Sequence, residues 1–165
     1  MIIGNTVHFI HLAYPTDIVT DIRNYNHFNP KELNPILKLA ICEGNPSHYE
    51  IIHTILQKYP PGAFEITHFA SGDEFLRTVA ENGCPYSIVL TDIDLGSDNV
   101  NGISLAEKIN YISPDTQIIF ISQYLQYATA VYETEHAYFI HKQQMEKYLP
   151  LALRTACQKL EKLHT

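Results

Sequence analysis

The sequence predicts an α/β domain in which a five-stranded parallel sheet is covered by helices on both faces. Five short apolar runs, rich in Ile, Val and Leu and bounded by turn residues, are typical of buried strands. Segments with apolar residues at helical spacing separate these runs. Strands that alternate with helices form parallel sheets joined by right-handed crossovers, and such sheets carry helices on both faces.

The first half of the domain alternates strand and helix twice. The expected elements are a strand over 36–42, a helix that starts at Pro46, a strand over 64–70 and a helix over 71–82. Proline is tolerated in a first helical turn, and Tyr59-Pro-Pro-Gly62 ends that helix. Ser71 and Glu74 have the spacing of a capping box at the start of the next helix.

The second half repeats the alternation. The expected elements are a central strand over 86–92, a helix over 101–112, a strand over 117–122, a helix over 125–135, a strand over 137–142 and a closing helix over 144–163. Pro150 lies early in the closing helix and predicts a kink or a restart there. Residues 1–36 show no sustained periodicity, so we interpret them as an N-terminal extension of unclear structure outside a main domain at 37–165.

Composition excludes several classes of protein. A length of 165 residues suits one domain, and eighteen acidic residues against eleven Lys and Arg argue against direct binding of nucleic acid. Cys42, Cys84 and Cys157 form no C-x-x-C pair, which favours reduced core thiols in a cytoplasmic protein. No apolar run approaches the ~20 residues of a membrane helix. Nine scattered histidines lack the spacing of metal ligands.

Polar residues stand at the ends of four predicted strands. Glu43 follows the first strand, Asp92 ends the third, Ser122 ends the fourth and Lys142 ends the fifth. The carboxyl ends of parallel strands meet at one edge of the sheet, where sites form. A carboxylate can accept a phosphoryl group covalently, a second acid can share Mg²⁺ with it, and a hydroxyl and an ammonium can meet the phosphoryl oxygens. The pattern therefore predicts phosphoryl transfer to Asp92.

The region 37–165 resembles the receiver domain of two-component response regulators. The shared pattern is an acidic turn after strand one, a lone Asp after strand three with Asn101-Gly102 downstream, a Ser after strand four, and Phe139 three residues before Lys142. The spacing and the closing run Leu149-Pro-Leu-Ala-Leu153 most resemble the branch with a LytTR-type DNA-binding output. The resemblance implies a flavodoxin-like strand order, 2-1-3-4-5.

The resemblance also implies roles for individual residues. Asp92 would be the phospho-acceptor; Glu43, Asp92 and the main-chain carbonyl of Asp94 would hold Mg²⁺; Ser122 and Lys142 would contact the phosphoryl group; and Phe139 would be the aromatic switch. One position departs from the family, which usually has a second acid where this chain has Gly44. The loss of a carboxylate from a hard-cation site predicts weak Mg²⁺ binding.

A histidine kinase is the partner that the resemblance implies. The only chemistry expected is self-phosphorylation and self-dephosphorylation, so the chain is not predicted to be an enzyme in the usual sense. It contains no output domain, so its effect would pass through another protein, or the chain would be a truncated regulator. The family also implies a homodimer through the face formed by the helix at 125–135, the fifth strand and the closing helix.

Two other functions compete with phosphoryl acceptance. Gly44 would suit a pseudo-receiver that acts as an unphosphorylated binding module. Asp92-Ile-Asp94 resembles the D-x-D signature of haloacid-dehalogenase-like phosphatases, although that family places the signature on its first strand and needs a further acidic pair. Individual residues also have structural interpretations: Ser122 as a helix N-cap, Phe139 as a core residue.

Overall fold

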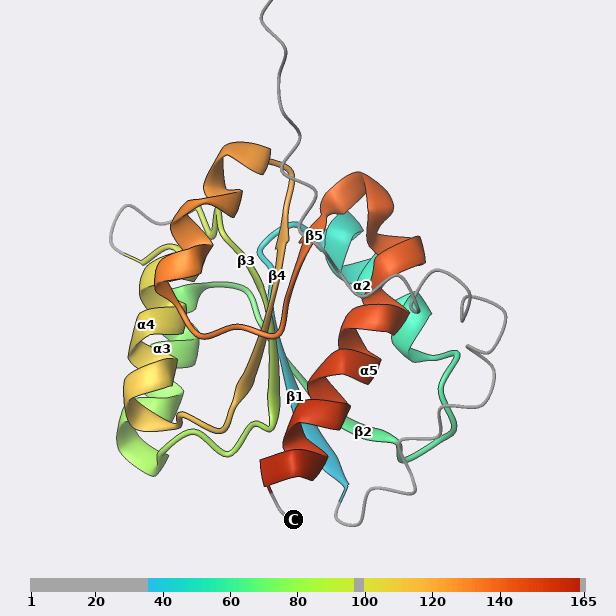
Figure 1. Cartoon of the computed structure of the whole chain (residues 1–165), viewed down its shortest axis with the longest axis horizontal. Helices are drawn as coiled ribbons and strands as arrows, with labels where there is room; N and C mark the ends of the chain where they lie inside the picture. Colours follow the sequence, from blue (N-terminus) through green and yellow to red (C-terminus); the bar gives the residue numbers. More distant parts are fainter. Residues whose placement is uncertain (1–35, 97–99, 164–165) are drawn as a thin grey trace, which may run out of the picture.

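The computed structural model describes residues 36–96 and 100–163, and these residues form one sheet with helices on both sides (Figure 1). The strands are β1 (Leu37–Cys42), β2 (Phe64–Phe69), β3 (Ile88–Asp92), β4 (Gln117–Ser122) and β5 (Tyr138–His141). The α-helices are α2 (Pro46–Leu56), α3 (Gly72–Asn82), α4 (Gly102–Ile112) and α5 (Met145–Leu163), and the 3-10 helices are η3 (Leu125–Ala128), η4 (Ala130–Glu133) and η5 (Lys142–Gln144). The predicted extension falls, except for Ile36, outside the described residues.

The sheet has the order β2-β1-β3-β4-β5, and each neighbouring pair of strands is parallel. This confirms the predicted fold class and strand order. Helices α2 and α5 cover one face, and α3 and α4 cover the other, as Figure 1 shows on its right and left sides. All five strands therefore run in the same direction and bring their carboxyl ends to one edge.

Two hydrophobic cores lie on opposite faces of the sheet. Side chains alternate between them: Leu39 and Ile41 of β1 pack with α2 and α5, whereas Ala40 and Cys42 pack with α3 and α4. Every residue of β3 and β4 is buried, which explains why these strands appear in the sequence as continuous apolar runs. Each buried Ile or Leu contributes about 1.5–3 kcal/mol, so the central strands hold their ends firmly.

Three local predictions differ from the structure. Residues 125–135 form the 3-10 helices η3 and η4 instead of an α-helix; only Val131 is buried within them, so no apolar stripe anchors a longer helix. Helix α5 continues across Pro150 without a restart. The capping box of α3 is half formed, because Ser71 Oγ accepts from Glu74 N while the Glu74 carboxylate accepts from Ala70 N.

The cysteines are free thiols, as predicted. Cys42 and Cys157 are buried and Cys84 is half-buried. Among the described residues, no helix is both long enough and apolar enough to span a bilayer.

Candidate functional site

Three of the predicted site residues meet at the carboxyl edge of the sheet. Glu43 directly follows β1, Asp92 is the last residue of β3, and Lys142 directly follows β5. Lys142 Nζ donates to Glu43 Oε2 at 2.8 Å and to Asp92 Oδ2 at 2.5 Å. Both carboxylates and the lysine side chain are buried, so this is an ion cluster with little solvent screening.

Burial and charge together set the ionisation of Asp92. Desolvation raises the pKa of Asp92 above its ordinary value, and the nearby Glu43 carboxylate raises it further. The hydrogen bond and charge of Lys142, together with the amide of Asp94, act in the opposite direction. The Asp92 carboxylate therefore depends on Lys142 for its negative charge, and any group that draws Lys142 away changes that balance.

His48 is a site residue that the sequence analysis missed. It lies in the first turn of α2, and its Nδ1 is 2.8 Å from Lys142 Nζ and 3.6 Å from Glu43 Oε2. In the sequence, only the position of His48 shortly after Glu43 could have indicated that it belongs to the site. Because an ammonium can only donate, Nδ1 accepts this hydrogen bond and the neutral ring carries its proton on Nε2.

Hydrogen bonds to both the main-chain nitrogen and the main-chain oxygen of Glu43 hold the loop after β1 in place. Glu43 N donates to Phe69 O at 3.1 Å, and His68 Nε2 donates to Glu43 O at 2.8 Å. The His68 ring stacks on Tyr49 with 3.9 Å between ring centroids. Asn45 N donates to Glu43 Oε1 at 2.9 Å, so the second carboxylate oxygen is fixed as well. Three hydrogen bonds, one of them from a ring that is itself stacked, thus orient Glu43 toward Lys142.

The remaining predicted residues lie at the same edge with different contacts. Ser122 is fully buried and follows Ile121, the register partner of Asp92; its Oγ accepts from Tyr124 N at 3.1 Å. This bond closes a turn before η3, whose N-cap residue is Tyr124, so Ser122 is not the helix N-cap that its position suggested. Asp94 N donates to Asp92 Oδ1 at 3.2 Å, whereas the Asp94 side chain accepts from Gly96 N. Phe139 is half-buried and packs against the core beneath α3 and α4.

Gly44 stands where the family pattern has an acid. A Cβ at this position would lie 3.0 Å from the main-chain oxygen of Ala70, which is a tight but not prohibitive contact. Within 36–96 and 100–163, no cluster of three or more His, Cys, Asp or Glu side chains has the arrangement of a metal site. Two carboxylates nevertheless converge on one cation, the Lys142 ammonium. Proteins usually bind Mg²⁺ through one or two carboxylates, with phosphate and water as the other ligands.

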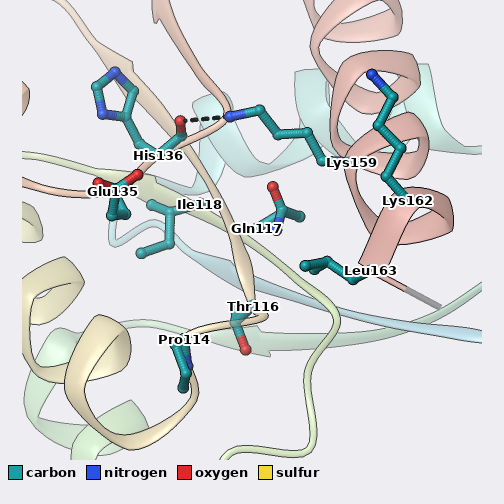
Figure 2. A pocket seen from close by; sticks show the side chains of 9 residues that line it. All are labelled: Pro114, Thr116, Gln117, Ile118, Glu135, His136, Lys159, Lys162 and Leu163. Atoms are coloured by element: carbon teal, nitrogen blue, oxygen red, sulfur yellow. Dashed lines mark hydrogen bonds between the residues drawn. The ribbon is translucent and has the colours of Figure 1, made fainter. Parts of the chain in front are cut away.

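A separate hollow of about 320 Å³ lies at the opposite edge of the sheet (Figure 2). Thr116 and Gln117 line it at the start of β4, and Lys159 and Lys162 line it from the last turns of α5. Lys159 Nζ donates to His136 O at 3.1 Å across its rim. The hollow lies at the start of β4, whereas Asp92 lies beside the end of β4. The hollow is therefore separate from the cluster around Lys142.

Comparison with known proteins agrees with this architecture. The family model of the response regulator receiver domain matches residues 39–154. No curated protein sequence matches the chain significantly. Among solved structures, a response regulator receiver domain protein from Clostridium thermocellum is 20% identical, with a TM-score of 0.63, and the match covers 78% of this chain and 99% of that one.

Two further structures give the same result. The response regulatory domain of protein mrkE from Klebsiella pneumoniae is 20% identical, with a TM-score of 0.66 and coverage of 76% of this chain and 99% of that one. A CheY-like receiver domain protein from Methanospirillum hungatei JF-1 is 21% identical, with a TM-score of 0.65 and coverage of 77% and 98%. At this identity the structures show the fold, and the family model shows the family. The chain belongs to the response regulator receiver domain family of two-component signalling.

Proposed function

We propose that this receiver domain accepts a phosphoryl group on Asp92 from a histidine kinase. The observation that carries the proposal is the contact of the Lys142 ammonium with both Asp92 and Glu43 in one buried cluster. A cation beside an acceptor carboxylate offsets the negative charge that arrives with the phosphoryl group. Such chemistry requires positioning and charge more than additional catalytic groups, and its turnover is limited to the domain's own phosphorylation and dephosphorylation.

The transfer step uses an oxygen of Asp92 as nucleophile. This oxygen attacks the phosphorus of the kinase phosphohistidine, the new bond is an acyl phosphate, and the phosphorus–nitrogen bond of the donor breaks. The electron pair of that bond returns to the imidazole of the kinase. Lys142 and Ser122 are the residues placed at the edge to meet the transferred oxygens, by charge and by hydroxyl donation respectively.

Magnesium would be held by Glu43, Asp92 and the main-chain carbonyl of Asp94. When bound, the ion supplies positive charge to the phosphoryl oxygens. A pair of buried carboxylates that already surround a cation fits this requirement, but the set lacks the acid that Gly44 replaces. We therefore propose a weak magnesium site whose affinity increases when the phosphoryl group adds further oxygen ligands.

Phosphorylation would act on a partner or on the association of two copies. About two added negative charges at the strand ends can change the contacts of nearby loops and of Phe139, which packs on one core. We propose that the domain works in the cytoplasm and dimerises through η3, η4, β5 and α5. The relation to the branch with LytTR-type output also belongs to this proposal.

The decisive experiment measures Asp92-dependent phosphorylation. The purified protein is incubated in Mg²⁺ either with acetyl phosphate or with a candidate kinase and ATP, and the intact mass is followed. We expect the mass of one phosphoryl group on the unmodified protein and on Asp94→Asn, whose side chain is turned toward Gly96, but not on Asp92→Asn. Equal labelling of Asp92→Asn would refute the assignment, and no labelling under any condition would favour the pseudo-receiver.

A phosphatase of the haloacid-dehalogenase type is less consistent with these residues. Asp92 ends β3 and not the first strand of the domain, and the Asp94 carboxylate accepts a hydrogen bond within its own turn. Hydrolysis of p-nitrophenyl phosphate by the same preparation would revive that alternative.

A further inference from the structure

The ammonium of Lys142 has a full set of acceptors. A lysine carries three N–H donors, and Lys142 Nζ lies within hydrogen-bond distance of Glu43 Oε2, Asp92 Oδ2 and His48 Nδ1. Two of these acceptors are charged and buried. The third is a neutral imidazole whose side chain is 27% exposed. An oxygen atom that enters the pocket can bond to Lys142 only if one of the three acceptors gives up its place.

We propose that His48 is a positioning residue for Lys142. It holds the ammonium between Glu43 and Asp92 in the resting site, and it is the acceptor that Lys142 exchanges for a phosphoryl oxygen. Of the three acceptors in the resting site, His48 is the least costly to lose, because it is neutral and water can reach its partly exposed ring. Loss of either carboxylate contact in the resting site would leave a buried charge with one partner fewer. The exchange of His48 for a phosphoryl oxygen rests on the proposed function. The hydrogen bond between Lys142 and His48 does not depend on it.

The position of His48 is itself fixed. Helix α2 begins at Pro46, and Asn45 Oδ1 accepts from the amides of Ser47 and His48 at 2.9 and 3.4 Å. The main-chain amide of the same Asn45 donates to Glu43 Oε1. The cap of α2 therefore ties the backbone of His48 to one of the carboxylates that Lys142 contacts. His53, further along α2, instead lies beside Tyr49, with 5.6 Å between ring centroids, and serves as a matched control.

The first test reads the ring tautomers by long-range ¹H–¹⁵N correlation at about pH 8.5, above the ordinary histidine pKa. In the unmodified protein we expect His48 as the Nε2–H tautomer. His68, which donates through Nε2, should show the same tautomer, and His136, whose Nδ1 faces Thr134 O, the opposite one. These two rings calibrate the spectrum. A His48 ring with its proton on Nδ1 would overturn the proposal without any variant.

Lys142→Met then separates a specific contact from an intrinsic preference. We expect the Nδ1 resonance of His48 to shift in this variant while the resonances of His68 and His136 stay in place. An unchanged His48 resonance in a folded variant would mean that Lys142 does not bond to it, and would overturn the proposal. If the variant does not fold, the unmodified protein can still overturn the proposal, because a proton on Nδ1 of His48 would exclude the contact.

The second test measures the exchange. Beryllofluoride, which mimics the phosphoryl group, is titrated in Mg²⁺ into the unmodified protein, His48→Ala, His48→Gln and His53→Ala. Because Lys142 no longer has to give up an acceptor, we expect about three- to tenfold tighter binding to His48→Ala. His48→Gln, which restores an acceptor oxygen, and His53→Ala should bind as the unmodified protein does. Unchanged or weaker binding to His48→Ala would overturn the exchange.

The two tests also distinguish failure of this inference from failure of the proposed function. If neither the unmodified protein nor any variant binds beryllofluoride or takes up a phosphoryl group, the proposed function is wrong, and the proposed exchange of acceptors is wrong as well. The tautomer experiment together with the Lys142→Met comparison in that case still decides whether His48 positions Lys142 in a resting ion cluster.

Discussion

Asp92 is a buried acid whose proton should couple to the stability of the domain. Burial and the neighbouring Glu43 raise the pKa of Asp92 above its ordinary value of 3.8, so the folded state binds this proton more tightly than the unfolded chain does. The resulting stabilisation is fully present below the ordinary pKa. It disappears as the pH rises through the higher pKa of the folded state, where Asp92 loses its proton.

We therefore expect Asp92→Asn to gain stability relative to the unmodified protein as the pH rises from about 4 to 7. Urea denaturation of both proteins across this range measures the difference in the free energy of unfolding. Glu43, Lys142 and His48 are the charged or titratable groups of the cluster that contains Asp92, and all three are present in both proteins. A difference that is independent of pH, or that falls as the pH rises, would contradict the prediction.

Gly44 should control the affinity for divalent cations. Gly44→Asp adds a carboxylate beside Glu43, and we expect its Mg²⁺ affinity to rise about tenfold or more, since a further charged oxygen ligand strengthens a hard-cation site. The matched control is Gly44→Ala, which has the same Cβ, 3.0 Å from Ala70 O, without the carboxylate. Isothermal titration calorimetry measures both. An equal gain in Gly44→Ala would show that backbone change, and not charge, is responsible.

The residues of the ion cluster differ in how easily they could be predicted from the sequence. Glu43, Asp92 and Lys142 each follow or end a strand, and parallel strands share an edge, so their meeting follows from secondary structure alone. His48 is on a helix, and its contact with Lys142 depends on the rotation of α2 about its axis. Spacing along one helix does not reveal that rotation relative to the end of another strand.

At the scale of elements, α4 is joined closely to the end of β3. Gly102 N donates to Ile93 O at 2.8 Å, and a methyl group at Gly102 would run into the main-chain oxygen of Asp92 and lie 2.8 Å from Ile93 Cα. This contact fixes the backbone at and just after Asp92, the proposed phospho-acceptor. It also explains why glycine stands at the first position of a helix that Asn101 caps.

We expect Gly102→Ala to destabilise the domain by about 2 kcal/mol or more, because the forced backbone shift outweighs the ~1 kcal/mol that alanine gains in a helix. Thermal and urea denaturation measure this change. Gly62→Ala is the comparison: nothing lies within 4 Å of its added Cβ, and its positive φ of 78° should cost only about 1 kcal/mol. A smaller loss at Gly102 than at Gly62 would contradict the prediction.

The accuracy of the predicted elements varied with burial. Strands β3 and β4 were evident because all their residues are buried and most of their side chains are apolar, with the polar residues at the strand ends. Residues 125–135 lack such a signal. Their helical composition favoured an α-helix, but Val131 is the only apolar residue of this range that is buried, and the segment forms two short 3-10 helices. Pro150 predicted an interruption of α5, yet the buried stripe of that helix, including Leu149 and Leu153, keeps it continuous.

At the scale of the whole molecule, the proposed dimer face has exposed apolar side chains. Leu125 is 63% exposed and Tyr132 is 58% exposed on η3 and η4. If beryllofluoride promotes dimerisation through this face, Leu125→Ser/Tyr132→Ser should weaken the dimer about tenfold or more, because most of the energy of an interface comes from a few such anchors. Sedimentation velocity over a concentration series measures the dissociation constant.

The matched control for this experiment is Tyr111→Ser. Tyr111 is 90% exposed near the end of α4, outside the proposed face. We expect this variant to associate as the unmodified protein does. Equal weakening by Tyr111→Ser would instead indicate non-specific association through exposed aromatic side chains, and an unaffected double variant would place the interface elsewhere.

The distance along the chain between the members of the ion cluster affects how the protein is made. Lys142 lies 50 residues after Asp92 and 99 residues after Glu43. During synthesis the ribosome therefore releases both acids well before their counterion, and a nascent chain that ends before β5 lacks the cation that Glu43 and Asp92 share. Docking of the last strand supplies that cation, so the step that completes the sheet also completes the ion cluster.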